Sequence, residues 1–133
     1  EPSMLSTSLL GVVGQRLVGR LCANCRVPRR VTEKEVEDLG FDPALLRRNT
    51  LFEANPRGCQ LCRQGLSGRI PIHEVLISDH NIADAIAEGA TQHTIRDLAR
   101  AGGMTSMRED GWEKILAGVT SISEVNENTR REH

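Results

Sequence analysis

The 133-residue sequence predicts a mainly α-helical fold with one small β-hairpin that is bound to a metal ion. Two observations favour this fold class. After Ser78, signals that begin a helix alternate with glycines that end one. Before Ser78, the four cysteines form two CxxC pairs, and a segment with strand character lies on each side of the second pair. Helical signals outnumber strand signals, so the fold is predicted to be mainly α.

The first predicted element is a helix from Pro2 to Leu21. Leu10, Val13, Leu17 and Leu21 recur at helical spacing, which gives the segment one long apolar face. Such a face at the start of a chain needs a partner. We therefore expect the chain to be part of a larger protein.

Two short helices are predicted between the CxxC pairs. Thr32 and Glu35 form a capping box, and Gly40 is placed to end the helix that it opens. Asp42 is the expected N-cap of a second helical segment over 44–48.

Strand character is found in TLFEA (50–54) and in GRIPIHEVL (68–76), where apolar and polar residues alternate. Pro71 cannot donate a ladder hydrogen bond, so the second strand is expected to be short or at an edge. Because the two strands bracket the second CxxC pair, we expect them to form a hairpin like that of a zinc ribbon.

The segment after Ser78 is predicted to form one compact helical lobe with short loops. Its first helix runs from about Asn81 to Glu88. The other three begin at Thr91, Ser106 and Ser121.

The only cysteines are Cys22, Cys25, Cys59 and Cys62. A CxxC turn presents two sulfurs to one ion, and two such turns complete the tetrahedral shell that zinc prefers. The 33-residue spacer (26–58) is long for this purpose, but its predicted helices can return the chain. Four thiolates close the shell, which is typical of structural rather than catalytic zinc. A redox motif, a pair of disulfides and another metal remain alternatives.

The histidines offer a different ligand set, in which His73, His80 or His93 replaces a thiol. The favoured interpretation keeps all four cysteines as ligands and treats the histidines as ordinary surface or interface residues. No GxxxxGK[ST] phosphate loop occurs, and no residue pattern suggests a nucleophile with its base. The chain alone is therefore not expected to be catalytic.

Charge is unevenly spread, although the net charge is only −1. Residues 1–72 contain 11 Arg and Lys against 7 Asp and Glu, whereas residues 73–133 contain 6 against 11. The arginines around the cysteines allow an alternative of another class, a zinc-ribbon module that binds nucleic acid. Only three aromatic residues are present, which disfavours base stacking. A free-standing redox regulator is a third hypothesis.

Four ordered motifs resemble the secretion traffic ATPases, the family of general secretory pathway protein E and its type IV pilus-assembly relatives. The first two are SLLGVVGQRLVGRLCANC and GCQLCRQG. The third is the GRIPIHE strand that follows, and the fourth is GMTSMREDGWEKILAGVTSISEV. The resemblance runs from about Leu9 to Thr129. It implies the C-terminal part of a cytoplasmic hexameric motor that powers type II secretion, with pilus assembly as the alternative.

The resemblance also implies a division of the chain and a set of ligands. Residues 1–21 would be a helix from the end of the ATPase core, 22–67 a tetracysteine zinc subdomain, and 68–133 a strand with a C-terminal helical subdomain. Zinc would be bound by the four cysteines, while ATP and magnesium would be bound only by the whole protein. Arg69, and less strongly Arg16, are implied to contact nucleotide or a neighbouring subunit.

The partners implied by the resemblance are the other subunits of a homohexamer and the cytoplasmic parts of inner-membrane platform proteins. The protein would then be cytoplasmic and peripheral at the inner membrane. The run MLSTSLLGVVG is too short to span a bilayer, and nucleic acid is not expected as a partner.

Overall fold

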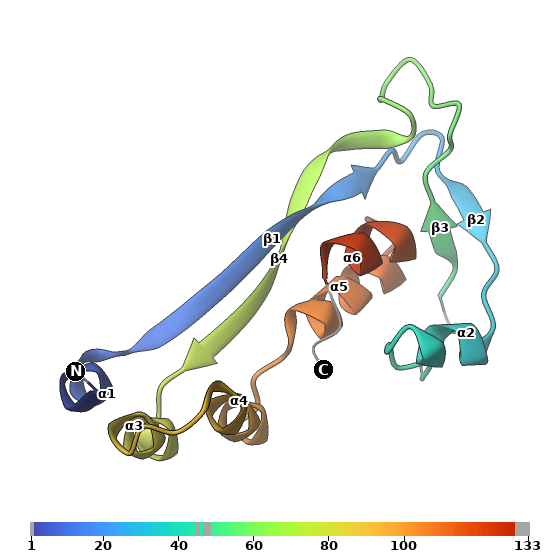
Figure 1. The fold of residues 1–133 in the computed structure, drawn as a ribbon. Helices are drawn as coiled ribbons and strands as arrows, with labels where there is room; N and C mark the ends of the chain where they lie inside the picture. Colours follow the sequence, from blue (N-terminus) through green and yellow to red (C-terminus); the bar gives the residue numbers. More distant parts are fainter. Residues whose placement is uncertain (1, 45, 47–48, 130–133) are drawn as a thin grey trace. The chain divides into compact units, whose positions relative to one another are not determined.

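The computed structural model describes residues 2–44, 46 and 49–129 (Figure 1). The helices are α1 (Pro2–Ser8), α2 (Glu33–Asp38), α3 (His80–Ala87), α4 (Gln92–Ala101), α5 (Met107–Leu116) and α6 (Ile122–Asn128). The strands are β1 (Gly11–Leu21), β2 (Val27–Arg29), β3 (Leu51–Glu53) and β4 (Leu66–Ile77). None of the helices in the described ranges is long and apolar enough to cross a membrane.

The predicted helix over Pro2–Leu21 is correct only for α1, because Gly11–Leu21 forms strand β1. The helical spacing of leucines is misleading here. The stretch carries glycines at positions 11, 14 and 19, and each glycine costs a helix roughly 1 kcal/mol relative to alanine. Its valines are β-branched and suit a strand. The partner strand that settles the choice, β4, lies more than 40 residues further along the chain.

The strands form two separate two-stranded sheets, β1 with β4 and β2 with β3 (Figure 1). In the second sheet Val27 faces Glu53 and Arg29 faces Leu51 in antiparallel register. The predicted hairpin between the segments 50–54 and 68–76 is therefore wrong, since these segments become β3 and β4 and take different partners. The fold is a mixture of helices and small sheets rather than mainly α.

The chain divides into two compact units, which are described separately. One consists of residues 1–14 and 73–106, where α1 packs on α3 and α3 on α4. The buried residues of its core are Ile82, Ile86 and Ala99. The other consists of residues 15–72 and 107–133, so the expected single lobe of helices after Ser78 is wrong. The division into 1–21, 22–67 and 68–133 stays a prediction about the whole protein.

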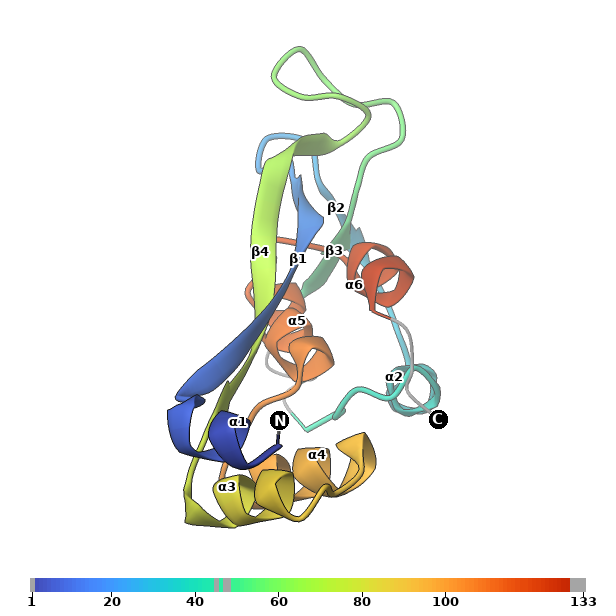
Figure 2. The ribbon, with the colours of Figure 1, turned by 60° about the vertical axis from the view of Figure 1, so that its left-hand side comes forward.

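The larger unit builds its main core from both halves of the sequence. Segment 30–53 contributes one set of apolar side chains and helices α5 and α6 contribute the other. Helix α5 also contacts β3, and the two elements can be followed in Figure 2. The buried members are Val36, Phe41, Leu51, Trp112, Ile115, Ile122 and Val125. The Phe41 ring stacks on Trp112 with centroids 5.0 Å apart. Trp112 therefore lies where segment 30–53 meets helix α5.

Arg108 closes one end of this core. Its guanidinium lies 4.4 Å from the centroid of the Phe41 ring and donates hydrogen bonds to the carbonyl oxygens of Leu39 and Thr129. A further bond goes to Asn126 Oδ1 at 2.8 Å. One side chain thus ties α5 to the end of α2 and to the end of α6.

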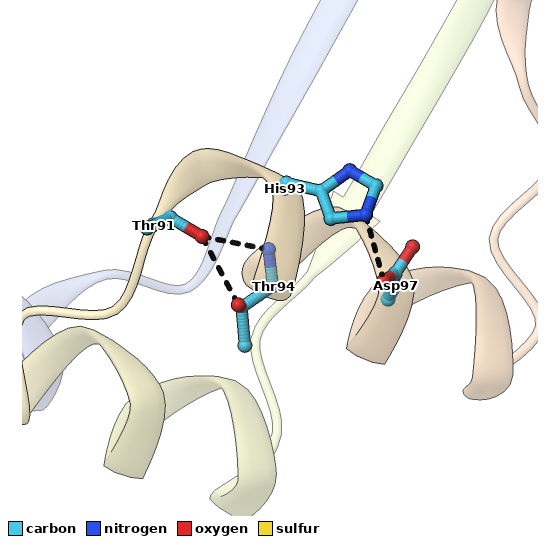
Figure 3. A network of polar contacts seen from close by, with 4 residues as sticks. All are labelled: Thr91, His93, Thr94 and Asp97. Atoms are coloured by element: carbon cyan, nitrogen blue, oxygen red, sulfur yellow. Dashed lines mark hydrogen bonds and ion pairs between the residues drawn. The ribbon is translucent and has the colours of Figure 1, made fainter.

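Most of the predicted helix starts are confirmed. Side-chain oxygens accept hydrogen bonds from the backbone three residues on, at the predicted N-caps Thr32, Thr91 and Ser121. Asp79, which the sequence analysis did not name, caps α3 in the same way. Figure 3 shows the cap of α4, where Thr91 Oγ1 accepts from Thr94 N at 3.2 Å. Asp42 Oδ1 accepts from Ala44 N at 2.9 Å as an N-cap would, but most of the predicted helix over 44–48 falls outside the described residues.

Candidate metal centre

The four cysteines come from two loops that adjoin the sheets. Cys22 directly follows β1, and Cys25 lies three residues later in the turn before β2. Cys59 and Cys62 lie in the loop between β3 and β4. The loops are joined by a hydrogen bond from Cys22 N to the carbonyl oxygen of Gly65 at 2.8 Å. Two CxxC turns that are 33 residues apart in the sequence are thereby brought together.

The sulfur atoms are spaced for one ion. The Sγ atoms of Cys22 and Cys59 are 3.7 Å apart, those of Cys25 and Cys62 3.6 Å, and those of Cys59 and Cys62 3.7 Å. All four sulfurs lie within 4.8 Å of one another, and the thiols are free. A tetrahedron with zinc–sulfur bonds of about 2.3 Å has edges of about 3.8 Å. The four cysteines are therefore close enough to hold a metal ion, and the spacing is compatible with zinc.

Hydrogen-bond donors point at two of the sulfurs. Cys59 Sγ accepts from Asn24 Nδ2 and from Leu61 N, each at 3.4 Å. Cys62 Sγ accepts from Cys59 N at 3.3 Å. Such bonds favour the thiolate, which is the form that binds metal. The bond from Asn24, followed by that from Leu61, lowers the pKa of Cys59 to about 6.

Cys25 is shifted in the opposite direction. Burial, followed by the hydrogen bond with Cys62, raises the pKa of the Cys25 thiol to about 12. Without a cation its thiol keeps its proton near neutral pH, because burial disfavours the charged thiolate. A divalent ion reverses this preference, since a coordinating thiol is deprotonated. The donor set is thus complementary to a soft divalent cation.

Two glycines let the loop between β3 and β4 close on the cysteines. Gly58 has φ +65° and Gly65 has φ +90°, a region that favours glycine. A Cβ atom on Gly65 would lie 2.6 Å from the backbone N and O of Asn55. A side chain there would push the two arms of the loop apart and disturb the carbonyl that accepts from Cys22.

The first CxxC turn is also tied to the turn between α5 and α6. Arg26 Nη1 donates to the carbonyl oxygen of Gly118 at 2.5 Å, and its guanidinium carbon lies 3.9 Å from the centroid of the Phe52 ring. Leu21 N donates to the carbonyl oxygen of Val119 at 2.9 Å. The sequence analysis missed Arg26, because its partner is 92 residues away. The only available signal was an arginine directly after the second cysteine.

His73, His80 and His93 lie outside the cluster, whose members among the described residues are four cysteines. His93 instead pairs with Asp97 one turn along α4, with 3.3 Å between Nε2 and Oδ2 (Figure 3). Both side chains are largely exposed, at 82% and 63%. His93 behaves as the surface residue that the sequence analysis favoured.

The two arginines singled out by resemblance are both exposed, Arg16 on β1 and Arg69 on β4. Neither belongs to the cysteine cluster. Within the described ranges, neither guanidinium has an ion pair or hydrogen bond. Their role at a nucleotide or subunit boundary stays a prediction.

The sequence of this chain is similar to those of known proteins. A family model described as "Type II/IV secretion system protein" matches residues 1–127. A type II secretion system protein E from Pseudomonas aeruginosa is 42% identical over 133 residues, covering 99% of this chain and 26% of the relative. The corresponding protein from Pectobacterium carotovorum is 39% identical, covering 99% of this chain and 25% of the relative.

A pilus protein is similar to the same degree. The type IV pilus assembly ATPase PilB from Thermus thermophilus is 38% identical over 126 residues, covering 94% of this chain and 14% of the relative. The chain thus spans about a quarter of the length of the secretion relatives and less of the pilus relative. Because the family model matches residues 1–127 of the 133 residues, this chain belongs to the type II/IV secretion system protein family.

Proposed function

We propose that this chain is the zinc-containing region of a secretion ATPase, and that zinc fixes the loops that join its two small sheets. The sulfur spacing of 3.6–3.7 Å carries this proposal. Four thiolates leave no open coordination position, so the ion stabilises structure and does not activate water. Because metal ligands must be deprotonated and brought together, binding of the ion contributes directly to folding.

The proposed activity belongs to the whole protein, which would bind ATP and magnesium and act as a homohexamer. Type II secretion is the first candidate process, and type IV pilus assembly is the second. Both have support, since relatives named for each are about 40% identical to this chain. In either case we place the protein in the cytoplasm, at the inner face of the inner membrane. There it would contact the cytoplasmic parts of platform proteins.

The metal proposal is tested by measuring the zinc content of the purified protein. We expect about one zinc per chain, and we expect Cys59→Ser or Cys62→Ser to lower that content strongly. His93→Ala is the matched control, because its side chain pairs with Asp97 and is outside the cluster. A protein that contains no metal, and whose unfolding is unchanged by a strong chelator, would disprove the proposal.

The proposed arginine roles need the whole ATPase. We propose that Arg69, and less strongly Arg16, contact nucleotide or a neighbouring subunit. Replacing either by glutamine should then lower kcat for ATP hydrolysis at least tenfold while the zinc content is unchanged. Arg30→Gln is a suitable control, since Arg30 is also exposed but lies on neither β1 nor β4. Unchanged kcat in both variants would contradict the assignment.

A further inference from the structure

The chain around the cysteines is strongly cationic. Segments 20–30 and 54–70 together contain seven arginines, no lysine and no aspartate or glutamate. A zinc ion with four thiolates carries two negative charges, which leaves this region with five positive charges. The whole chain has a net charge of −1. The positive charge is therefore a local property of the cysteine loops.

Some of these arginines already have partners within the chain. Arg26 donates to Gly118, and Arg29 pairs with Glu35 at 3.7 Å. The other five have exposed side chains, and none of the five has a side-chain hydrogen bond or ion pair within the described part of the chain: Arg20, Arg30, Arg57, Arg63 and Arg69. They remain available to a negatively charged partner.

Arg57 and Arg63 lie on neighbouring arms of one loop. A Cβ atom on Gly58 would lie 3.0 Å from Gln64 N, so the residues that follow the two arginines run against each other. Arg63 N and Leu66 N each donate to the other residue's carbonyl oxygen at 2.9 Å, which closes the loop onto the start of β4. The two guanidinium groups are thus carried by a backbone that is held in place.

Beside Arg63 lies an open groove of about 530 Å³. We call it the knuckle groove, and its lining includes Gln60, Leu61, Cys62, Arg63, Leu66 and Ser67. Leu61 is 71% exposed although its backbone N–H is bonded to Cys59 Sγ. An exposed leucine in the same groove as Arg63 offers apolar contact and charge in one place.

The kind of partner follows from what the surface lacks. All three aromatic rings of the chain are used internally, since Phe52 lies under Arg26 and Phe41 stacks on Trp112. No ring is left to stack on bases, which disfavours a single-stranded nucleic acid. Leu61 is the one exposed large apolar side chain that lines the groove. One such side chain gives too little apolar area for insertion into a lipid surface. Guanidinium forks match carboxylates in two parallel hydrogen bonds.

We propose that the knuckle groove is a docking site for an acidic peptide segment of a partner protein, one that carries an apolar side chain among its carboxylates. Arg57 and Arg63 pair with the carboxylates, and Leu61 with Leu66 contacts the apolar side chain. This proposal rests on the zinc centre proposed above, because the ion holds the loop that presents Leu61.

The test uses the zinc-loaded protein and a fluorescent twelve-residue peptide made of glutamate, aspartate and two leucines. A second peptide replaces each acid by its amide. By fluorescence anisotropy we expect the acidic peptide to bind about tenfold more tightly than the amide peptide, and its affinity to fall steeply with salt. Leu61→Ser should weaken binding about fivefold.

Variants locate the site. Arg57→Gln with Arg63→Gln should weaken binding of the acidic peptide about tenfold, whereas Arg30→Gln should leave it unchanged. Zinc content is measured on every variant, so a failure of the metal site is distinguished from a failure of docking. If the double variant lost its zinc, the docking proposal would still be tested by comparing the affinities of the acidic and the amide peptide for the unmodified protein. Equal affinity for them, or tighter binding of an oligonucleotide or of phosphatidylglycerol vesicles, would overturn the proposal.

Discussion

Gly111→Ala sets two known effects against each other inside α5. Gly111 is buried in the middle of the helix, where alanine is favoured over glycine by about 1 kcal/mol. A Cβ atom built there would lie 2.5 Å from Val125 Cγ1 and 3.1 Å from Cγ2. The first distance is well inside van der Waals contact. The Val125 side chain is fully buried and stiff at χ1, so it cannot move aside without disturbing α6.

Overpacking of this kind costs about 1–3 kcal/mol, which exceeds the gain in helix propensity. We therefore expect Gly111→Ala to lower the free energy of unfolding by about 1–2 kcal/mol. Trp112 is the only tryptophan and lies in the affected core, so its fluorescence during urea unfolding measures the change. Zinc should be kept saturating in both proteins.

A double-mutant cycle checks the mechanism. Val125→Ala alone removes two buried methyl groups and should cost about 2 kcal/mol. Added to Gly111→Ala, it should cost less than that, because it gives the new methyl group room. If Gly111→Ala proved as stable as the parent protein or more so, helix propensity would dominate and the packing argument would be refuted.

Three further predictions concern Arg26, Arg108 and the cysteine thiols. Arg26→Gln should weaken zinc binding about tenfold in a chelator competition, because the first CxxC turn loses its bond to Gly118; Arg30→Gln should not change it. Arg108→Met should lower the free energy of unfolding by about 2–3 kcal/mol, seen as an earlier thermal transition, since carbonyl acceptors at both ends lose their donor. An unchanged transition would show that water replaces the guanidinium. Zinc binding at pH 7 should release at least one proton, because the Cys25 thiol, whose pKa is about 12 without metal, must lose its proton to bind, and affinity should fall as the pH falls. Calorimetry in buffers of different ionisation enthalpy counts the protons, and a count of zero would contradict this.

Local chemistry made part of the fold predictable. Helix starts at Thr32, Thr91 and Ser121 depend on one side chain and an amide three residues away, so a short window of sequence contains both partners. The cysteine pairs also allowed a metal site to be predicted from the sequence, because the spacing of the thiols alone restricts the coordination chemistry. The structure then supplied the sulfur distances, which sequence cannot give.

Long-range partners account for what was missed. The β1 segment was interpreted as a helix because its strand partner is distant in sequence and its leucines happen to recur at helical spacing. The helices after Ser78 looked like one lobe, but α5 and α6 share their core with Val36, Phe41 and Leu51. Pairing of this kind depends on which surfaces meet, and neither propensity nor periodicity reports it.

The bond from Cys22 N to Gly65 O has a consequence for how this fold tolerates insertion and deletion. It joins the end of β1 to the start of β4, so the two strands form a long ribbon and residues 23–64 are its loop. Geometrically, a turn of a few residues would close the same ribbon. That replacement would also remove Val36, Phe41 and Leu51, leaving Trp112 and Val125 without the apolar surface they pack against. A shortened relative would have to make the facing side of α5 and α6 polar, or cover it with another part of the protein.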